Sequence, residues 1–161
     1  MKKTKVKVGD VCAIPLGDGD YAYAQIIDDS NQHCYIVYNY KSKNFSELQD
    51  LTKNKIIILT YTVDVFIENH RWPLLGNITL PSGIIFPNYI EGRLRGGKLR
   101  IIVVDHHANY IREASIEDKK KLFFKSSVSP IILEDVTKFK LLGIGRYRPY
   151  MDEMFYGAAS E

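Results

Sequence analysis

The stretch GDVCAIPLGDGDYAYAQIIDD (residues 9–29) holds two short β-prone runs on either side of an acidic turn. Gly and Asp tolerate the left-handed backbone that tight hairpins need, so residues 17–20 are expected to reverse the chain. A calcium loop beginning at Asp18 would need an oxygen ligand at its fifth position and glycine at its sixth. Those positions hold Ala22 and Tyr23. The stretch therefore predicts a β-hairpin and not a calcium site.

The residues that follow extend this hairpin into a larger antiparallel sheet. HCYIVYNY (33–40) follows a polar turn and supplies a third strand, and the three-residue spacing of apolar residues within 44–54 suits a short helix. In IIILTYTVDVFI (56–67) every odd-numbered residue is apolar or aromatic, which predicts a central strand. The Pro and Gly residues of 73–87 indicate irregular chain with short edge strands.

The later part of the chain changes from strands to helices. Residues 89–105 predict a second hairpin with a two-residue turn at Gly96-Gly97. Asp118 completes a capping box with Ser115, and a second helix is expected to start at Ser129-Pro130 and to end before Gly143. The aromatic tail is expected to dock onto the body of the protein.

The predicted class is α+β and mostly β. We expect an antiparallel twisted sheet or partly open barrel built from hairpins, with one or two helices in the C-terminal third. A length of 161 residues suits a single domain over 1–161. Its parts would be a sheet over about 6–106, a helical part over about 115–143 and the tail at 144–161.

Composition narrows the function classes. The chain is 45% hydrophobic and 25% charged, as in ordinary globular proteins, and has 11 tyrosines. Lys and Arg (22) exceed Asp and Glu (19) by three, which is too small a surplus to indicate nucleic-acid binding. No segment is apolar enough to span a bilayer, and MKKTKVKVGD lacks the apolar region of a signal peptide, so a cytoplasmic protein is expected. Cys12 and Cys34 lie in apolar runs and are expected to be small buried residues without a disulfide.

Possible catalytic groups lack the spacing that chemistry needs. His106 and His107 follow Asp105, but adjacent strand residues point to opposite faces, so the sequence predicts a strand end that meets water. Glu68, His70 and Arg71 crowd one turn without partners converging from other elements. The two glycines of GIGRYR (143–148) follow a predicted helix, as a helix end does, and not a strand. We therefore expect no enzyme activity, cofactor or metal.

Two features leave alternatives open. Arg93, Arg95, Lys98 and Arg100 flank the Gly-Gly turn, where they would bind nucleic-acid phosphates or protect an exposed hairpin from aggregation. Trp72, the only tryptophan, is either a core residue or an anchor for a partner protein.

Two stretches resemble the bacterial Immunity protein 26 family. VGDVCAIPLGDGDYAYAQII (8–27) is similar to the N-terminal hairpin of that family, and RWPLLGNITLP (71–81) to its downstream Trp and Gly segment. Cys12 departs from the pattern, which has an aromatic or aliphatic residue there. The resemblance covers about the first 90 residues. It is carried by Gly9, Asp10, Ile14, Pro15, Leu16, Asp18, Gly19, Tyr21, Tyr23, Trp72 and Gly76.

The resemblance implies an immunity protein that binds a cognate toxin domain of a polymorphic toxin system and blocks it by occlusion. Complementary charge would speed capture, and the aspartates around the first hairpin form one candidate acidic patch, with the tail as a second. The candidate contact residues are Asp18, Asp20, Tyr21, Tyr23, Asp28, Asp29, Arg71, Trp72, Asp152 and Glu153. A small β-rich nucleic-acid-binding or other interaction module is the alternative, and it would use the basic hairpin.

Overall fold

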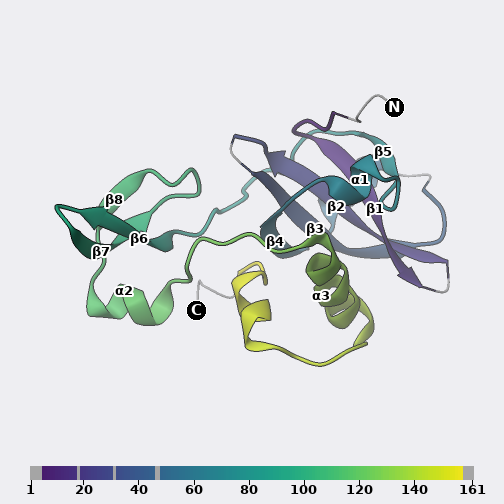
Figure 1. Cartoon of the computed structure of the whole chain (residues 1–161). Helices are drawn as coiled ribbons and strands as arrows, with labels where there is room; N and C mark the ends of the chain where they lie inside the picture. The colour runs from purple at the N-terminus through teal and green to yellow at the C-terminus, as the bar shows by residue number, and fades with distance from the viewer. Residues whose placement is uncertain (1–4, 18, 31, 46–47, 158–161) are drawn as a thin grey trace. The chain divides into compact units, whose positions relative to one another are not determined.

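The structure, a computed structural model, describes residues 5–17, 19–30, 32–45 and 48–157 (Figure 1). The described chain forms two compact units. The first unit contains the residues up to Ser82 and those from Ser127 onward, and the second unit is Gly83–Ser126. The single domain over 1–161 stays a prediction.

Five antiparallel strands form the sheet of the first unit, in the order β4-β3-β2-β1-β5. The sheet is open, and β1, β2 and β3, the first three strands along the chain, form the predicted meander. The turn between β1 and β2 pairs Gly17 with Asp20, so the opening hairpin is confirmed, although Asp18 lies outside the described residues. The strands are β1 (Asp10–Gly17), β2 (Asp20–Asp28), β3 (His33–Ser42), β4 (Ile56–Thr62) and β5 (Leu74–Asn77).

Both faces of this sheet are buried, which explains why its strands are almost continuously apolar. Helix α3 (Pro130–Leu142) packs on one face, where its Leu133 and Val136 join the main core. The 3-10 helix η1 (Leu48–Lys53) is the short helix predicted for 44–54, and it buries Leu51. The core on the α3 side includes Cys12, Ile14, Leu16, Ala22, Ala24, Ile26, Tyr35, Val37 and Trp72. Cys12 and Cys34 are buried, as predicted, and are not joined in a disulfide.

The prediction of a central strand over 56–67 is wrong. Strand β4 ends at Thr62, residues Val65–Glu68 form the short helix α1, and β4 lies at one end of the strand order. Its outer edge is instead covered by the C-terminal tail. The Leu59 amide donates to the Met154 carbonyl (2.8 Å), and the Tyr156 amide donates to the Ile57 carbonyl (3.1 Å). Coverage by chain far away in sequence therefore gives an edge strand the composition of a central one.

The tail and α3 follow the sequence prediction. Ser129 caps α3 at its N-terminus, and Gly143 ends the helix with a left-handed backbone (φ 67°). The tail forms the 3-10 helix η2 (Pro149–Glu153) and buries Met151 and Met154 in the core of the first unit. The predicted docking of the aromatic tail is thus confirmed.

The second unit contains a smaller antiparallel sheet of β6 (Tyr89–Arg95), β7 (Lys98–Val104) and β8 (Tyr110–Glu113), in that order. Gly96 and Gly97 form the predicted turn, both with positive φ (58° and 74°), as a tight hairpin requires.

Helix α2 (Ile116–Lys121) follows with the predicted capping box between Ser115 and Asp118. The mostly β α+β class is confirmed, with the strands of residues 6–106 divided between two open sheets instead of forming one. No helix in the described part of the chain is long and apolar enough to cross a membrane.

Candidate partner-binding surfaces

Arg71 and Trp72 are held by a single buried carboxylate on α3. Glu134 is 2% exposed and accepts hydrogen bonds from Arg71 Nε (3.1 Å) and Nη2 (2.5 Å) and from Trp72 Nε1 (3.0 Å). The bond to Glu134 raises the pKa of the Arg71 guanidinium, which also lies 4.4 Å from the Phe66 ring centre. Trp72 itself has no exposed surface. Of the two alternatives for this tryptophan, the structure places it in the core.

Sequence reasoning missed Glu134. Its signal was available: the carboxylate lies between Leu133 and Val136, in the part of the helix where apolar residues face the core. An acidic residue at such a position needs buried donors, and Arg and Trp are the side chains that supply them. What the sequence could not show is which distant donors these would be.

The aspartates of the first hairpin that the structure describes, Asp20, Asp28 and Asp29, do not form one patch. Asp20 begins β2 and Asp28 ends it, which separates the two by about 26 Å at 3.3 Å per residue. Asp20 pairs with Lys41 at 3.3 Å, while Asp28 accepts hydrogen bonds from the backbone and hydroxyl of Ser30. Asp29 is exposed beside Asp28. The single-patch prediction is wrong, because strand length sets the two ends apart.

The two tyrosines of this hairpin are held by local contacts. Tyr23 is buried, its hydroxyl lies 2.5 Å from that of Ser42, and it donates to the Asn44 carbonyl. Tyr21 is half-buried and packs edge-to-face on Phe45 with ring centres 4.8 Å apart. Tyr21 therefore presents more surface to a partner than Tyr23 does.

The acidic residues of the tail lie on η2. Asp152 is half-buried and accepts a hydrogen bond from the Tyr147 hydroxyl (2.5 Å), which raises the pKa of that tyrosine. Glu153 is exposed at the end of the same helix. The contact roles assigned to these tail and hairpin residues stay predictions.

The histidines follow β7 in a turn and not in a strand. Asp105 accepts hydrogen bonds from the backbone of His107 (2.9 Å) and from the backbone (2.8 Å) and side chain (3.0 Å) of Asn109. These hydrogen bonds lower the pKa of Asp105, and the two from Asn109 contribute most. The chain does leave the strand here and His107 is exposed, as predicted.

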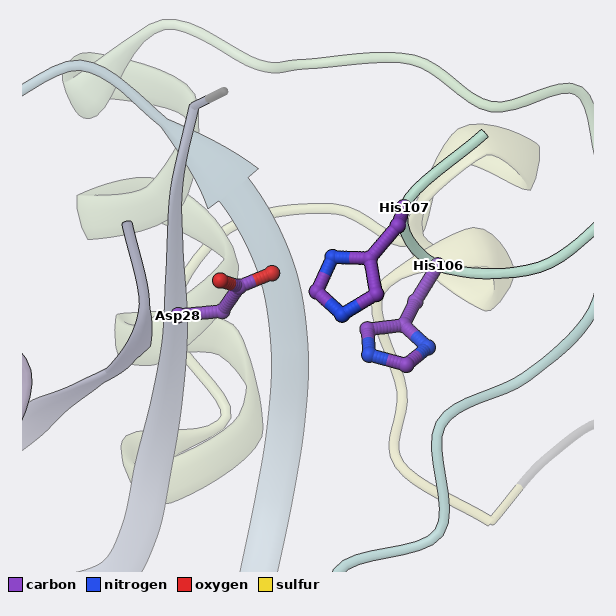
Figure 2. Close-up of side chains that lie close together, drawn as sticks. All are labelled: Asp28, His106 and His107. Carbon is purple, nitrogen blue, oxygen red and sulfur yellow. The ribbon is translucent and has the colours of Figure 1, made fainter. Parts of the chain in front are cut away.

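The imidazole rings of the two histidines lie side by side, as Figure 2 shows, with centres 3.8 Å apart. The expectation that they point to opposite faces is wrong, because strand alternation does not apply in a turn. His106 also stacks on Phe86 at 4.0 Å. Among the described residues of the second unit, no further His, Cys, Asp or Glu completes a group of three with these rings. Asp28, also drawn in Figure 2, belongs to the first unit.

The four basic residues of the second hairpin share one face of the β6–β7 ribbon. Arg93 is opposite Arg100, and Arg95 is opposite Lys98. Arg93 pairs with Glu91 (2.9 Å), and Arg100 pairs with Glu113 (3.2 Å). Two of the four cations are thus partly neutralised on their own face.

Sequence reasoning singled out these charges and missed the leucines between them. In GRLRGGKLR (92–100), Leu94 and Leu99 are equidistant from the Gly-Gly turn, so they must pair across the hairpin on the face opposite the charges. The structure pairs them in this way, and both are exposed. The symmetry of the motif could have revealed this pair.

Comparison with known proteins identifies the family. No curated protein and no solved structure matches the chain. The sequence model of the Immunity protein 26 family matches residues 7–92, more than half of the chain. The match includes the whole sheet of the first unit and ends within β6. The protein therefore belongs to the Immunity protein 26 family.

Proposed function

We propose that this protein binds and neutralises a cognate bacterial toxin domain by stoichiometric occlusion, in the cytoplasm of the producing cell and its kin. The observation that carries the proposal is the family match over residues 7–92. An immunity protein implies a toxin as its partner, and occlusion is the simplest way for a compact binding protein to inhibit it. The protein itself would transform no substrate.

The roles of its reactive groups support a binding protein. The carboxylate of Glu134 is occupied by three donors in the core, and that of Asp105 holds a turn together. Burial raises the pKa of the Cys12 thiol to about 12, so that thiol is a poor nucleophile near neutral pH. These groups stabilise the fold, which is the use expected of them in an inhibitor scaffold.

Neutralisation by occlusion sets a demand on affinity. An inhibitor must leave almost no free toxin at cellular concentrations, which requires a dissociation constant of about 1 nM or lower, or a binding free energy of about −12 kcal/mol. Such affinity comes from a few buried apolar or Arg anchors surrounded by a polar rim. The binding surface should therefore present exposed apolar side chains next to charges.

The test is a titration against the cognate toxin domain, for which the genes next to this one are the first candidates. The purified domain is mixed with increasing amounts of the protein, and residual toxin activity and complex mass are measured. Stoichiometric occlusion predicts that activity falls linearly and reaches zero at one equivalent, in a complex that can be dissociated to recover active toxin. Inactivation by substoichiometric amounts, or toxin that stays inactive after separation, would instead indicate an enzyme that modifies the toxin.

A further inference from the structure

The tip of the β6–β7 hairpin is a two-stranded ribbon with two different faces. Strand β8 pairs with β7 only at Ile102–Val104, and the Ala114 amide bonds to the Ile101 carbonyl, so the ribbon beyond Ile101 has no third strand among the described residues. Every residue from 92 to 100 is exposed. This segment therefore extends from the small core of the second unit with both faces available.

One face of the ribbon is apolar up to its end. Leu94 and Leu99 are directly opposite each other and are 78% and 68% exposed. The Leu99 side chain packs on the backbone of Gly92. A Cβ added at Gly92 would lie 3.3 Å from the Leu99 Cδ1, so a side chain there would crowd the leucine. Half-buried Ile101 continues this face toward Ile90 and Val103 in the core.

The other face carries the charges. Arg93 and Arg100 are engaged by Glu91 and Glu113, and the Arg93 guanidinium also donates to the Ala108 carbonyl (2.6 Å). Arg95 and Lys98, next to the turn, make no ion pair among the described residues. The unneutralised positive charge of the ribbon is thus concentrated at its tip, beside the exposed leucines.

We propose that the hairpin tip, residues 93–100, is the element that contacts the toxin, with Leu94 and Leu99 entering an apolar pocket whose acidic rim receives Arg95 and Lys98. This inference rests on the proposed function and adds the surface and the chemistry of the partner. Exposed apolar residues flanked by cations are the composition expected of interface anchors. The positive charge of the tip is complementary to an acidic toxin cleft. Binding in this way does not require an acidic patch on the first hairpin.

A protein partner fits this ribbon better than a nucleic acid does. Protein surfaces that bind single-stranded nucleic acid use aromatic side chains to stack on bases, whereas the exposed pair of this hairpin, Leu94 and Leu99, is aliphatic. Glu91 and Glu113 lie on the charged face and would repel phosphates while occupying two of the four cations. Leucines gain most from a dry pocket, which a folded protein supplies.

The experiment uses the whole chain of residues 1–161 and the toxin domain that it inhibits in the titration above. Two double variants are compared with wild type, Leu94→Ser/Leu99→Ser for the apolar face and Arg95→Glu/Lys98→Glu for the tip charges. Ile131→Ser, at an exposed apolar position of α3, is the matched control for the first variant, and Lys119→Glu/Lys120→Glu on α2 is the control for the second. Circular dichroism and amide exchange of β6–β7 check the fold of each variant.

The leucine variant should raise the dissociation constant by about 30-fold or more, mainly through faster dissociation, because hot-spot residues have effects of this size. The charge variant should lower the association rate constant by about tenfold at low salt, with the difference shrinking as salt increases. Both control variants should bind within about twofold of wild type, as substitutions outside an interface do.

Different failures have different meanings. If wild type inhibits the toxin and both hairpin variants inhibit it equally well, the hairpin inference is overturned and the proposed function stands. If wild type neither binds nor inhibits, the proposed function falls and the inference with it. The inference is also overturned if the charge variant inhibits the toxin normally but is no longer retained on an oligonucleotide column, which would make the tip a nucleic-acid site. It is overturned as well if the leucine variant inhibits the toxin normally but no longer forms a homodimer, which would make the apolar face an interface between two copies of this chain.

Discussion

At the scale of single residues, Glu134 joins α3 to the segment that follows α1. Its carboxylate is buried, and it is acceptable there because Arg71 and the indole of Trp72 supply three hydrogen bonds. The same contacts fix the chain that follows α1. Glu134 therefore stabilises the fold by hydrogen bonds within an otherwise apolar core.

We expect Glu134→Ala to lower the free energy of unfolding by about 2–4 kcal/mol, because it leaves the buried Trp72 Nε1–H without an acceptor and removes a charge partner. Chemical denaturation at neutral pH measures this change. Asp135→Ala is the control, since it removes a carboxylate from the next, exposed position of the same helix and should change stability by about 0.5 kcal/mol or less.

A double-mutant cycle tests the physical reason. Trp72→Phe should cost less in the Glu134→Ala background than in wild type, because the indole donor that it removes is already unsatisfied there. Additive effects of the two substitutions would show that the carboxylate and the indole do not stabilise each other.

At the scale of elements, α2 depends on one carboxylate. Asp118 accepts hydrogen bonds from the Ser115 backbone (2.8 Å) and hydroxyl (2.7 Å) and pairs with Arg112. The Arg112 guanidinium, and then the Ser115 hydroxyl, hold the pKa of Asp118 below its ordinary value of 3.8. Because the folded pKa is lowered, the ionised carboxylate stabilises α2 above the ordinary value, and this stabilisation is lost as pH falls through the folded pKa.

The Asp118 carboxyl carbon, followed by NMR, should therefore titrate with a midpoint below 3.8. Asp118→Ala should weaken amide protection of residues 116–121 at neutral pH, and the difference from wild type should vanish once the carboxylate is protonated. Glu117→Ala, in the same first turn but outside the capping box, is the control and should keep that protection. A midpoint at the ordinary value would contradict the proposed role of Arg112.

Local signals predicted most elements. The two hairpins, the capping box and the limits of α3 all depend on residues close together in sequence, such as Gly96-Gly97 and Ser129-Pro130. The position of β4 in the sheet could not be predicted in this way. Its buried outer edge is produced by Met154 and Tyr156, about a hundred residues later, and composition alone does not distinguish such coverage from a neighbouring strand.

In the candidate surface, too, some features follow from neighbouring residues and others depend on residues far away in the sequence. The basic residues of the second hairpin were evident in the sequence, and their sharing of one face follows from strand alternation. Glu91, the partner of Arg93, lies two residues earlier on the same strand and face, so that pair follows from the sequence. The pairing of Arg100 depends on Glu113, a residue of β8, and on the register of β7 against that strand. That register had to be seen before Lys98 could be distinguished from Arg100.

At the scale of the whole molecule, the chain leaves the first unit, forms the second and returns. The Lys125 amide bonds to Ile90 in the second unit, and the Val128 amide bonds to Tyr61 in the first. The first crossing, at Ser82–Gly83, lies within the Pro- and Gly-containing irregular chain of residues 73–87, a composition that suits a surface loop as well as a unit boundary, so composition alone did not predict this division. The two units also differ in core size. The second unit buries only Tyr89, Ile90, Ile102, Val103 and Val104 among the apolar residues described.

A small core predicts that the second unit opens more readily than the first, as a local event within the folded chain. Hydrogen exchange under mild denaturant should give the amides of β6 and β7 an opening free energy at least about 2 kcal/mol below that of β1 to β3. Glu134→Ala should lower the value for β1 to β3 and leave that of β6–β7 unchanged. Equal values for all strands would show a single cooperative unit instead.

This difference in stability gives the hairpin inference a readout that does not depend on toxin activity. A ligand that binds only the folded hairpin suppresses its opening, by about 2.7 kcal/mol when its free concentration is a hundred times its dissociation constant. Saturation with the toxin domain should therefore raise the opening free energy of β6–β7 by this amount in wild type. In Leu94→Ser/Leu99→Ser at the same toxin concentration the increase should be about 2 kcal/mol smaller, because the ratio of free toxin to dissociation constant falls from about 100 to about 3. Protection that rises in β1 to β3 while β6–β7 stays unchanged would place the toxin on the first unit.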